Sequence, residues 1–168
     1  MNLQPEAWLQ PVARSQKPVM SDLSDLYQDV ILDHNRRPRN FGPLASADRQ
    51  AHGHNPLCGD KLTVYLGMDG DTIRQIQFEG AGCAISKASA SLMTDAVKGQ
   101  SLTDALSLFD RVHDMLTTPI AEPVNTDAVG KMAVLSGVRE FPARVKCASL
   151  AWHTLKAAMD REEKVSTE

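Results

Sequence analysis

The apolar positions along the chain first follow a helical period. Over residues 21–34 apolar side chains recur at every third or fourth position, which predicts a helix with one buried face. Ser21 stands where its side chain can cap the first turn. The predicted helix ends before Pro38, because the residue before a proline is displaced from helical geometry. The predicted buried face consists of Leu23, Leu26, Tyr27, Val30, Ile31 and His34.

Alternation of apolar and polar residues replaces this period over residues 61–68. Such a pattern is typical of a strand with one buried face. The Asp-Gly-Asp sequence at residues 69–71 supplies a turn, and the alternation resumes over residues 72–79. The two segments are therefore predicted to pair as an antiparallel hairpin. The stretch before Cys58 can add a third strand.

Helical segments make up most of the remaining chain. An Ala- and Ser-rich run over residues 83–99 ends at a glycine, which predicts a helix packed closely against the sheet. Further helices are predicted over residues 101–116, 125–140 and 143–163. This order of elements predicts an α+β fold, in which several helices cover one face of a small antiparallel sheet.

The length and composition of the chain indicate a single domain. With 168 residues and 42% hydrophobic composition, one compact core is expected. We predict a disordered extension over residues 1–20, a folded domain over residues 21–160 and a flexible tail over residues 161–168. The first twenty residues contain three prolines and no continuous apolar run, so they resemble neither a secretory signal nor a membrane span. The expected location is the cytoplasm, with no membrane attachment.

Charge and cysteine content narrow the possible functions. The formal net charge is -3 and no dense run of Lys or Arg occurs, so nucleic acid is not an expected partner. The chain has three cysteines, an odd number. In a reducing compartment, free thiols serve metals or catalysis more often than disulfides. Cysteine chemistry is therefore the function to pursue.

Each cysteine has a local setting that suits a thiolate. Cys58 lies in a tight Pro- and Gly-containing turn, where its thiol is expected to be partly exposed. Cys83 is expected at a helix N-terminus, and Cys147 follows Arg144 and Lys146, so both are predicted to have lowered pKa values. Because no Cys-x-x-Cys pair occurs, spacing alone favours packing of these cysteines in the core over metal binding.

Three longer segments favour metal binding over core packing. The sequences AHGHNPLCGD, FEGAGCAISKASASLM and FPARVKCASLAWHTL resemble, in order, the three cysteine blocks of the IscU/SufU family of iron–sulfur cluster assembly proteins. The resemblance extends over residues 22–160, roughly the whole predicted domain. It implies an α+β fold of the SufE/NifU type. It also implies that Cys58, Cys83 and Cys147 meet at one exposed site beside Asp60.

Three departures place the chain nearer the SufU branch than the IscU branch. Lys146 stands where IscU-type scaffolds have His, FPARVK replaces the LPPVK sequence gripped by an assembly chaperone, and an extra stretch falls around residues 117–129. The SufU resemblance implies a SufS-type cysteine desulfurase as partner and a downstream iron–sulfur scaffold complex as recipient. It implies Zn²⁺ as the cofactor, and the predicted ligands are Cys58, Asp60, Cys83 and Cys147.

The same resemblance suggests roles for single residues and leaves alternatives open. Cys58 is predicted to be the mobile ligand that accepts sulfur as the catalytic residue, because a turn moves more easily than a helix. Arg144 either screens the negative charge of the site or steadies a persulfide, and the alternative is an ordinary surface or salt-bridging residue. A scaffold that holds a transient iron–sulfur cluster on the same ligands is the first alternative, and a protein in which zinc only stabilises the fold is the second. His52 and His54 are interpreted as solvent-facing strand residues rather than a metal-binding pair.

Overall fold

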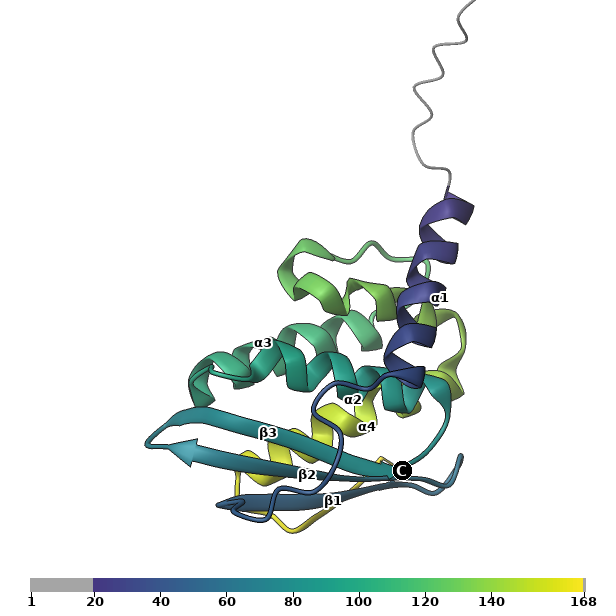
Figure 1. Ribbon diagram of the computed structural model, residues 1–168. Coiled ribbons are helices and arrows are strands. Elements are labelled where there is room, and N and C mark those ends of the chain that lie inside the picture. Colours follow the sequence, from purple (N-terminus) through teal and green to yellow (C-terminus); the bar gives the residue numbers. More distant parts are fainter. Residues whose placement is uncertain (1–19, 168) are drawn as a thin grey trace, which may run out of the picture.

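The structure, a computed structural model, describes residues 20–167. Of the predicted extension over residues 1–20, only Met20 lies within the described part, and the side chain of Ser21, the predicted cap, lies outside it. Figure 1 shows a sheet and several helices, which confirms the predicted α+β class. The elements are α1 (Met20–Arg36), β1 (Arg49–Asn55), β2 (Asp60–Asp69), β3 (Thr72–Ala81), α2 (Ala84–Val97), α3 (Leu102–Thr117), the 3-10 helix η1 (Asp127–Glu140), α4 (Pro142–Met159) and β4 (Lys164–Ser166).

The sheet has four strands in the order β3-β2-β1-β4. β2 pairs antiparallel with β3 through the predicted Asp-Gly-Asp turn, and β1 is the third strand expected before Cys58. The short strand β4 differs from the prediction of a flexible tail over residues 161–168. It pairs parallel with β1, and Val165 packs against the core, so burial and backbone pairing hold this segment. The sheet is therefore mixed rather than purely antiparallel.

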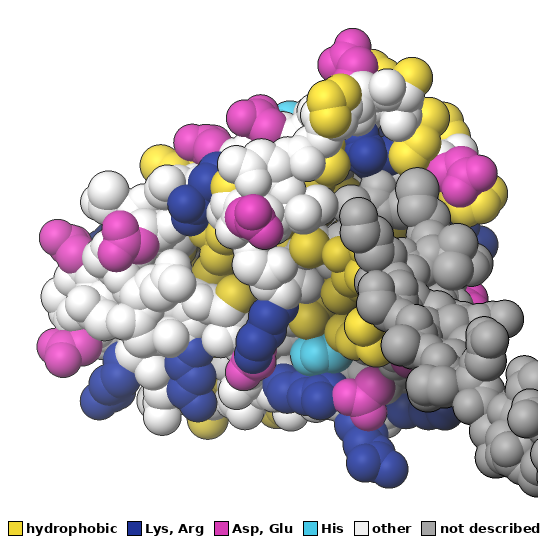
Figure 2. All heavy atoms as spheres, turned by 90° about the horizontal axis from the view of Figure 1, so that it is seen from above, with side chains coloured by type: hydrophobic (Ala, Val, Ile, Leu, Met, Phe, Trp, Pro, Cys, Tyr) yellow, Lys and Arg dark blue, Asp and Glu magenta, His cyan; other side chains and the backbone are white. Residues whose placement is uncertain are grey.

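The helices lie on one face of the sheet (Figure 1). The alternation in the strands determines this arrangement, because Leu62, Val64, Ile76 and Phe78 are all buried on the same side. α2 and α4 contact the strands, and α1, α3 and η1 pack on these two helices. Seen from the helical side, hydrophobic side chains lie in hollows between charged ones (Figure 2). No helix in the described part of the chain is long and apolar enough to cross a membrane.

α2 is a central helix rather than a surface one. Ser86, Ser89 and Ser91 are fully buried, because the small side chains let α2 approach α1, α4 and the sheet closely. The hydroxyl of Ser89 donates to the carbonyl of Ala148 on α4 at 2.6 Å. The Ala- and Ser-rich composition therefore serves close packing, and it fixes α2 and α4 relative to each other.

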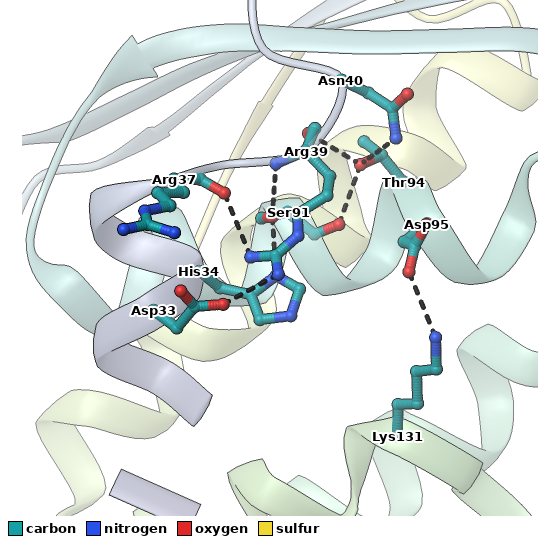
Figure 3. A network of polar contacts seen from close by, with 9 residues as sticks. All are labelled: Asp33, His34, Arg37, Arg39, Asn40, Ser91, Thr94, Asp95 and Lys131. Carbon is teal, nitrogen blue, oxygen red and sulfur yellow. Dashed lines mark hydrogen bonds and ion pairs between the residues drawn. The ribbon is translucent and has the colours of Figure 1, made fainter. Parts of the chain in front are cut away.

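A buried polar network ties the end of α1 to α2 (Figure 3). Nδ1 of His34 lies 2.8 Å from Oγ of Ser91, and the same oxygen accepts from the backbone N–H of Arg39 at 2.8 Å. The amide of Asn40 donates to Oγ1 of Thr94 at 3.1 Å. These contacts hold the segment after α1 against α2.

Two histidines make stability depend on pH. Burial lowers the pKa of His34 and of His153 in the folded protein below the value of about 6.5 that a histidine has in the unfolded chain. As the pH falls, these two residues are therefore protonated in the unfolded chain before they are protonated in the folded protein. The free energy of unfolding is therefore fully retained above pH ~6.5 and decreases as the pH falls below this value. Each of the two histidines lowers it by at most about 1.4 kcal/mol per pH unit. Urea unfolding between pH 7.5 and 5.5 measures this slope.

The variant His34→Gln/His153→Gln should unfold with a shallower pH slope than the wild type. His54→Gln, a change at an exposed position, is the matched control and should leave the slope unchanged. A double variant with the full wild-type slope would contradict the assignment.

Candidate metal centre

Cys58 lies in the turn that joins β1 to β2. Gly59 adopts a φ of 72°, a conformation that favours glycine, and its N–H donates to the carbonyl of Asn55 at 2.8 Å. The side chain of Cys58 is exposed, as the sequence predicts. Asp60 follows as the first residue of β2 and is buried, with 1% of its surface accessible. One short turn therefore presents an exposed thiol beside a buried carboxylate.

Cys83 caps the N-terminus of α2, as predicted. Its backbone N–H donates to Oδ1 of Asp60 at 3.0 Å, and its sulfur accepts from the N–H of Ser86 at 3.5 Å. Gly82 makes this approach possible, because a Cβ at that position would lie 2.8 Å from Oδ1 of Asp60. The glycine before the cysteine thus leaves room for the carboxylate.

Cys147 comes from the second turn of α4 and is fully buried. Its sulfur lies 3.2 Å from that of Cys58, a residue from a distant part of the chain. The ligand atoms of Cys58, Asp60 and Cys147 all lie within 4.8 Å of one another. The sulfur of Cys83 is outside that set but lies 3.9 Å from Oδ2 of Asp60. The structure thus brings the four predicted ligands to one end of the sheet.

The donor set fits zinc. Three sulfurs and one carboxylate are the number and type of ligands found in closed tetrahedral sites. With Zn–S distances of about 2.3 Å, two sulfurs in such a site lie about 3.8 Å apart, so Cys58 and Cys147 would separate by only about 0.6 Å. Buried thiolates and a buried carboxylate also need a cation nearby to offset their charge. Metal binding by these residues remains a prediction.

The charge environment differs from the sequence-based prediction for Cys147. The prediction of a lowered pKa from Arg144 and Lys146 is wrong, because burial raises the pKa of the Cys147 thiol well above its usual value. Arg144 itself lies at the site: the nearby Cys83, and hydrogen bonding to Cys83 and Cys147, raise the pKa of its guanidinium. Without a metal, the buried thiol would keep its proton.

Several other residues lie close to the predicted ligands in sequence, and the structure shows a different environment for each. His52 and His54 lie on the exposed face of β1, as interpreted from the sequence. Trp152 is a core residue with 1% of its surface accessible. Asn55 was not among the predicted site residues, yet it is fully buried and its amide faces the sulfur of Cys147 at 3.7 Å. Its position three residues before Cys58, at the start of a turn, was the available signal.

Comparison with known proteins identifies the family. The family model described as "NifU-like N terminal domain" matches residues 26–148. The chain belongs to this family. This NifU-like domain is 41% identical over 143 residues to the zinc-dependent sulfurtransferase SufU of Bacillus subtilis (strain 168), covering 85% of the chain and 95% of that protein.

Two further comparisons agree. The NifU-like domain is 41% identical over 142 residues to the iron–sulfur cluster assembly scaffold protein IscU of Streptococcus pyogenes serotype M1, covering 84% of the chain and 87% of that protein. Among solved structures, the N-terminal part of a nitrogen-fixing NifU-like protein from Brucella abortus matches with a TM-score of 0.73 and 27% identity, covering 83% of this chain and 95% of that one. The predicted membership in the IscU/SufU group of iron–sulfur cluster assembly proteins is confirmed.

Proposed function

We propose that this NifU-like domain is a zinc-dependent sulfurtransferase, which accepts persulfide sulfur from a cysteine desulfurase during iron–sulfur cluster assembly. The observation that carries the proposal is the meeting of three thiols and a carboxylate at one site where Cys58 is exposed and Cys147 is buried. A buried ligand holds a metal, whereas an exposed one can also reach a partner. The similarity to the zinc-dependent sulfurtransferase SufU supports this assignment.

Cys58, Asp60, Cys83 and Cys147 would hold the zinc ion. When bound, zinc keeps the thiols deprotonated at neutral pH, which is most important for Cys147, whose thiol is otherwise held protonated by burial. Three thiolates, one carboxylate and Zn²⁺ sum to a charge of about -2. The guanidinium of Arg144 lies beside Cys83 and Cys147 and offsets part of this charge.

Sulfur transfer would occur at Cys58. Its thiolate attacks the terminal sulfur of a persulfide on the desulfurase, so that a new S–S bond forms on Cys58. The original S–S bond breaks, and its electron pair leaves with the cysteine of the desulfurase as a thiolate. No external oxidant or reductant is needed, because the transferred sulfur keeps its oxidation state. Such chemistry requires free thiols and suits a reducing compartment such as the cytoplasm. A downstream scaffold complex would then receive the sulfur from Cys58.

A scaffold function is the second candidate. The chain is equally identical, at 41%, to a protein named as an IscU scaffold, and three thiolates with a carboxylate can also bind iron. Lys146 favours the sulfurtransferase, because it stands beside Cys147 where IscU-type scaffolds have His. A lysine ammonium has no lone pair with which to hold a cluster.

Metal analysis and desulfurase turnover decide between these functions. The purified chain should contain about one zinc ion, and it should raise the turnover of a SufS-type cysteine desulfurase at least about tenfold. Removal of zinc with a chelator should abolish the stimulation, and added zinc should restore it. A visible chromophore after reconstitution with iron and sulfide, together with weak stimulation, would instead support the scaffold. Zinc without any stimulation would leave the metal a purely structural role.

A further inference from the structure

A buried amide links the turn of Cys58 to helix α4. Asn55 is the last residue of β1 and pairs in register with Asp60 at the start of β2, so it closes the base of the turn. Its Oδ1 accepts from the N–H of Leu57 at 3.2 Å, and its carbonyl accepts from Gly59. Its Nδ2 lies 3.7 Å from the sulfur of Cys147. One side chain thus contacts both the exposed and the buried part of the site.

The orientation of this amide follows from its partners. The N–H of Leu57 can only donate, so the atom of Asn55 that faces it must be the oxygen. The NH₂ group must then face Cys147, whose sulfur can accept a weak hydrogen bond. Because Asn55 is fully buried, water does not compete for either contact.

We propose that Asn55 is a positioning residue of the metal centre, which donates an N–H···S hydrogen bond to the Cys147 thiolate and holds the Cys58 turn beside it. The inference rests on the proposed function and adds a residue that acts through the ligands. Partners of this kind fix the orientation of a ligand and tune its donation to the metal.

The chemistry of the site explains why an amide suits this position. The sulfur of a metal-bound Cys147 carries negative charge in a buried environment, which an N–H donor offsets. A carboxylate here would add a further negative charge between Asp60 and Cys147. Serine could still accept from Leu57 but is too short to reach the sulfur. Asparagine satisfies both neighbours without a charge.

The test uses Asn55→Asp, which keeps an acceptor for Leu57 but removes the donor to Cys147. We expect zinc affinity, measured by competition with a chromophoric chelator, to fall about 10- to 100-fold. In the Co²⁺-substituted protein, the thiolate-to-cobalt charge-transfer band should move to lower energy, because the sulfur loses its hydrogen bond. Asn55→Ser, which adds no charge, should change both readouts in the same direction.

Gln50→Glu is the matched control. It makes the same amide-to-carboxylate change on the same strand, but at an exposed position at the other end of β1. It should leave zinc affinity and the cobalt band unchanged. If Asn55→Asp and Asn55→Ser fold and show wild-type affinity and an unshifted band, Asn55 only closes the turn and the inference fails. If the variants lower the zinc affinity and shift the cobalt band but the wild type accepts no persulfide, the role of Asn55 stands and only the proposed function is wrong.

Discussion

Replacing Cys58 by alanine should reduce persulfide acceptance more than about 1000-fold, as expected for the loss of an attacking nucleophile. Cys58 is exposed in a turn, whereas Cys147 is fully buried and Cys83 is half-buried at a helix terminus. Only Cys58 can therefore approach a bulky partner without unfolding an element. Single-turnover transfer of radiolabelled sulfur from a persulfide-loaded desulfurase measures the effect, and mass spectrometry locates the sulfur.

The Cys58→Ala domain should remain folded, because an exposed turn residue contributes little to the core. Leu57→Ala, beside it in the same turn and 66% exposed, is the control for disturbance of the turn and should retain most of the transfer. Unchanged sulfur transfer to Cys58→Ala would show that another thiol accepts the persulfide sulfur.

Local sequence patterns predict the setting of each ligand well, but not their distances. The turn around Cys58 and the helix terminus at Cys83 follow from glycine, proline and periodicity, and the structure has both. Their proximity to Cys147 depends on how α4 packs across the sheet, since the ligands come from segments far apart in sequence. The resemblance to a family supplied that information, because cysteine spacing alone favoured core packing.

The electrostatics of Cys147 illustrate what neighbours in sequence leave out. Arg144 and Lys146 flank it closely, which suggests a stabilised thiolate. Burial on the inner face of α4 outweighs them and raises the pKa of the thiol. Burial depends on the packing of several elements, so it was not apparent from the flanking charges.

The burial of single small polar residues is another property that depends on packing. The sequence predicts a closely packed helix over residues 83–99 but not which of its serines are enclosed, and the structure buries Ser86 and Ser89 fully. Ser and Ala have similar sizes, so composition does not distinguish a solvated face from a closely packed one. The strand β4 poses a similar problem, because three residues form it only by pairing with β1. Such elements follow from tertiary contacts rather than local pattern.

Asp60→Ala should weaken zinc binding by about 100-fold or more, because it removes a ligand and also the acceptor for Cys83. The carboxylate is buried and lies 3.9 Å from the sulfur of Cys83, so water replaces it poorly. Chelator competition measures the affinity. Desulfurase stimulation should be lost in parallel at limiting zinc and recover as zinc is added.

Two variants separate the ligand role of Asp60 from its role in the turn. Asp60→Asn keeps an oxygen that accepts from Cys83 but loses the charge, so it should bind zinc more tightly than Asp60→Ala and less tightly than the wild type. Asp48→Ala removes a comparable bond, since Oδ2 of Asp48 accepts from the N–H of Met68 at 2.6 Å on an exposed part of the sheet, and it should leave zinc affinity unchanged. Wild-type affinity in Asp60→Ala would show that this carboxylate only shapes the turn, and the site would then need another fourth ligand.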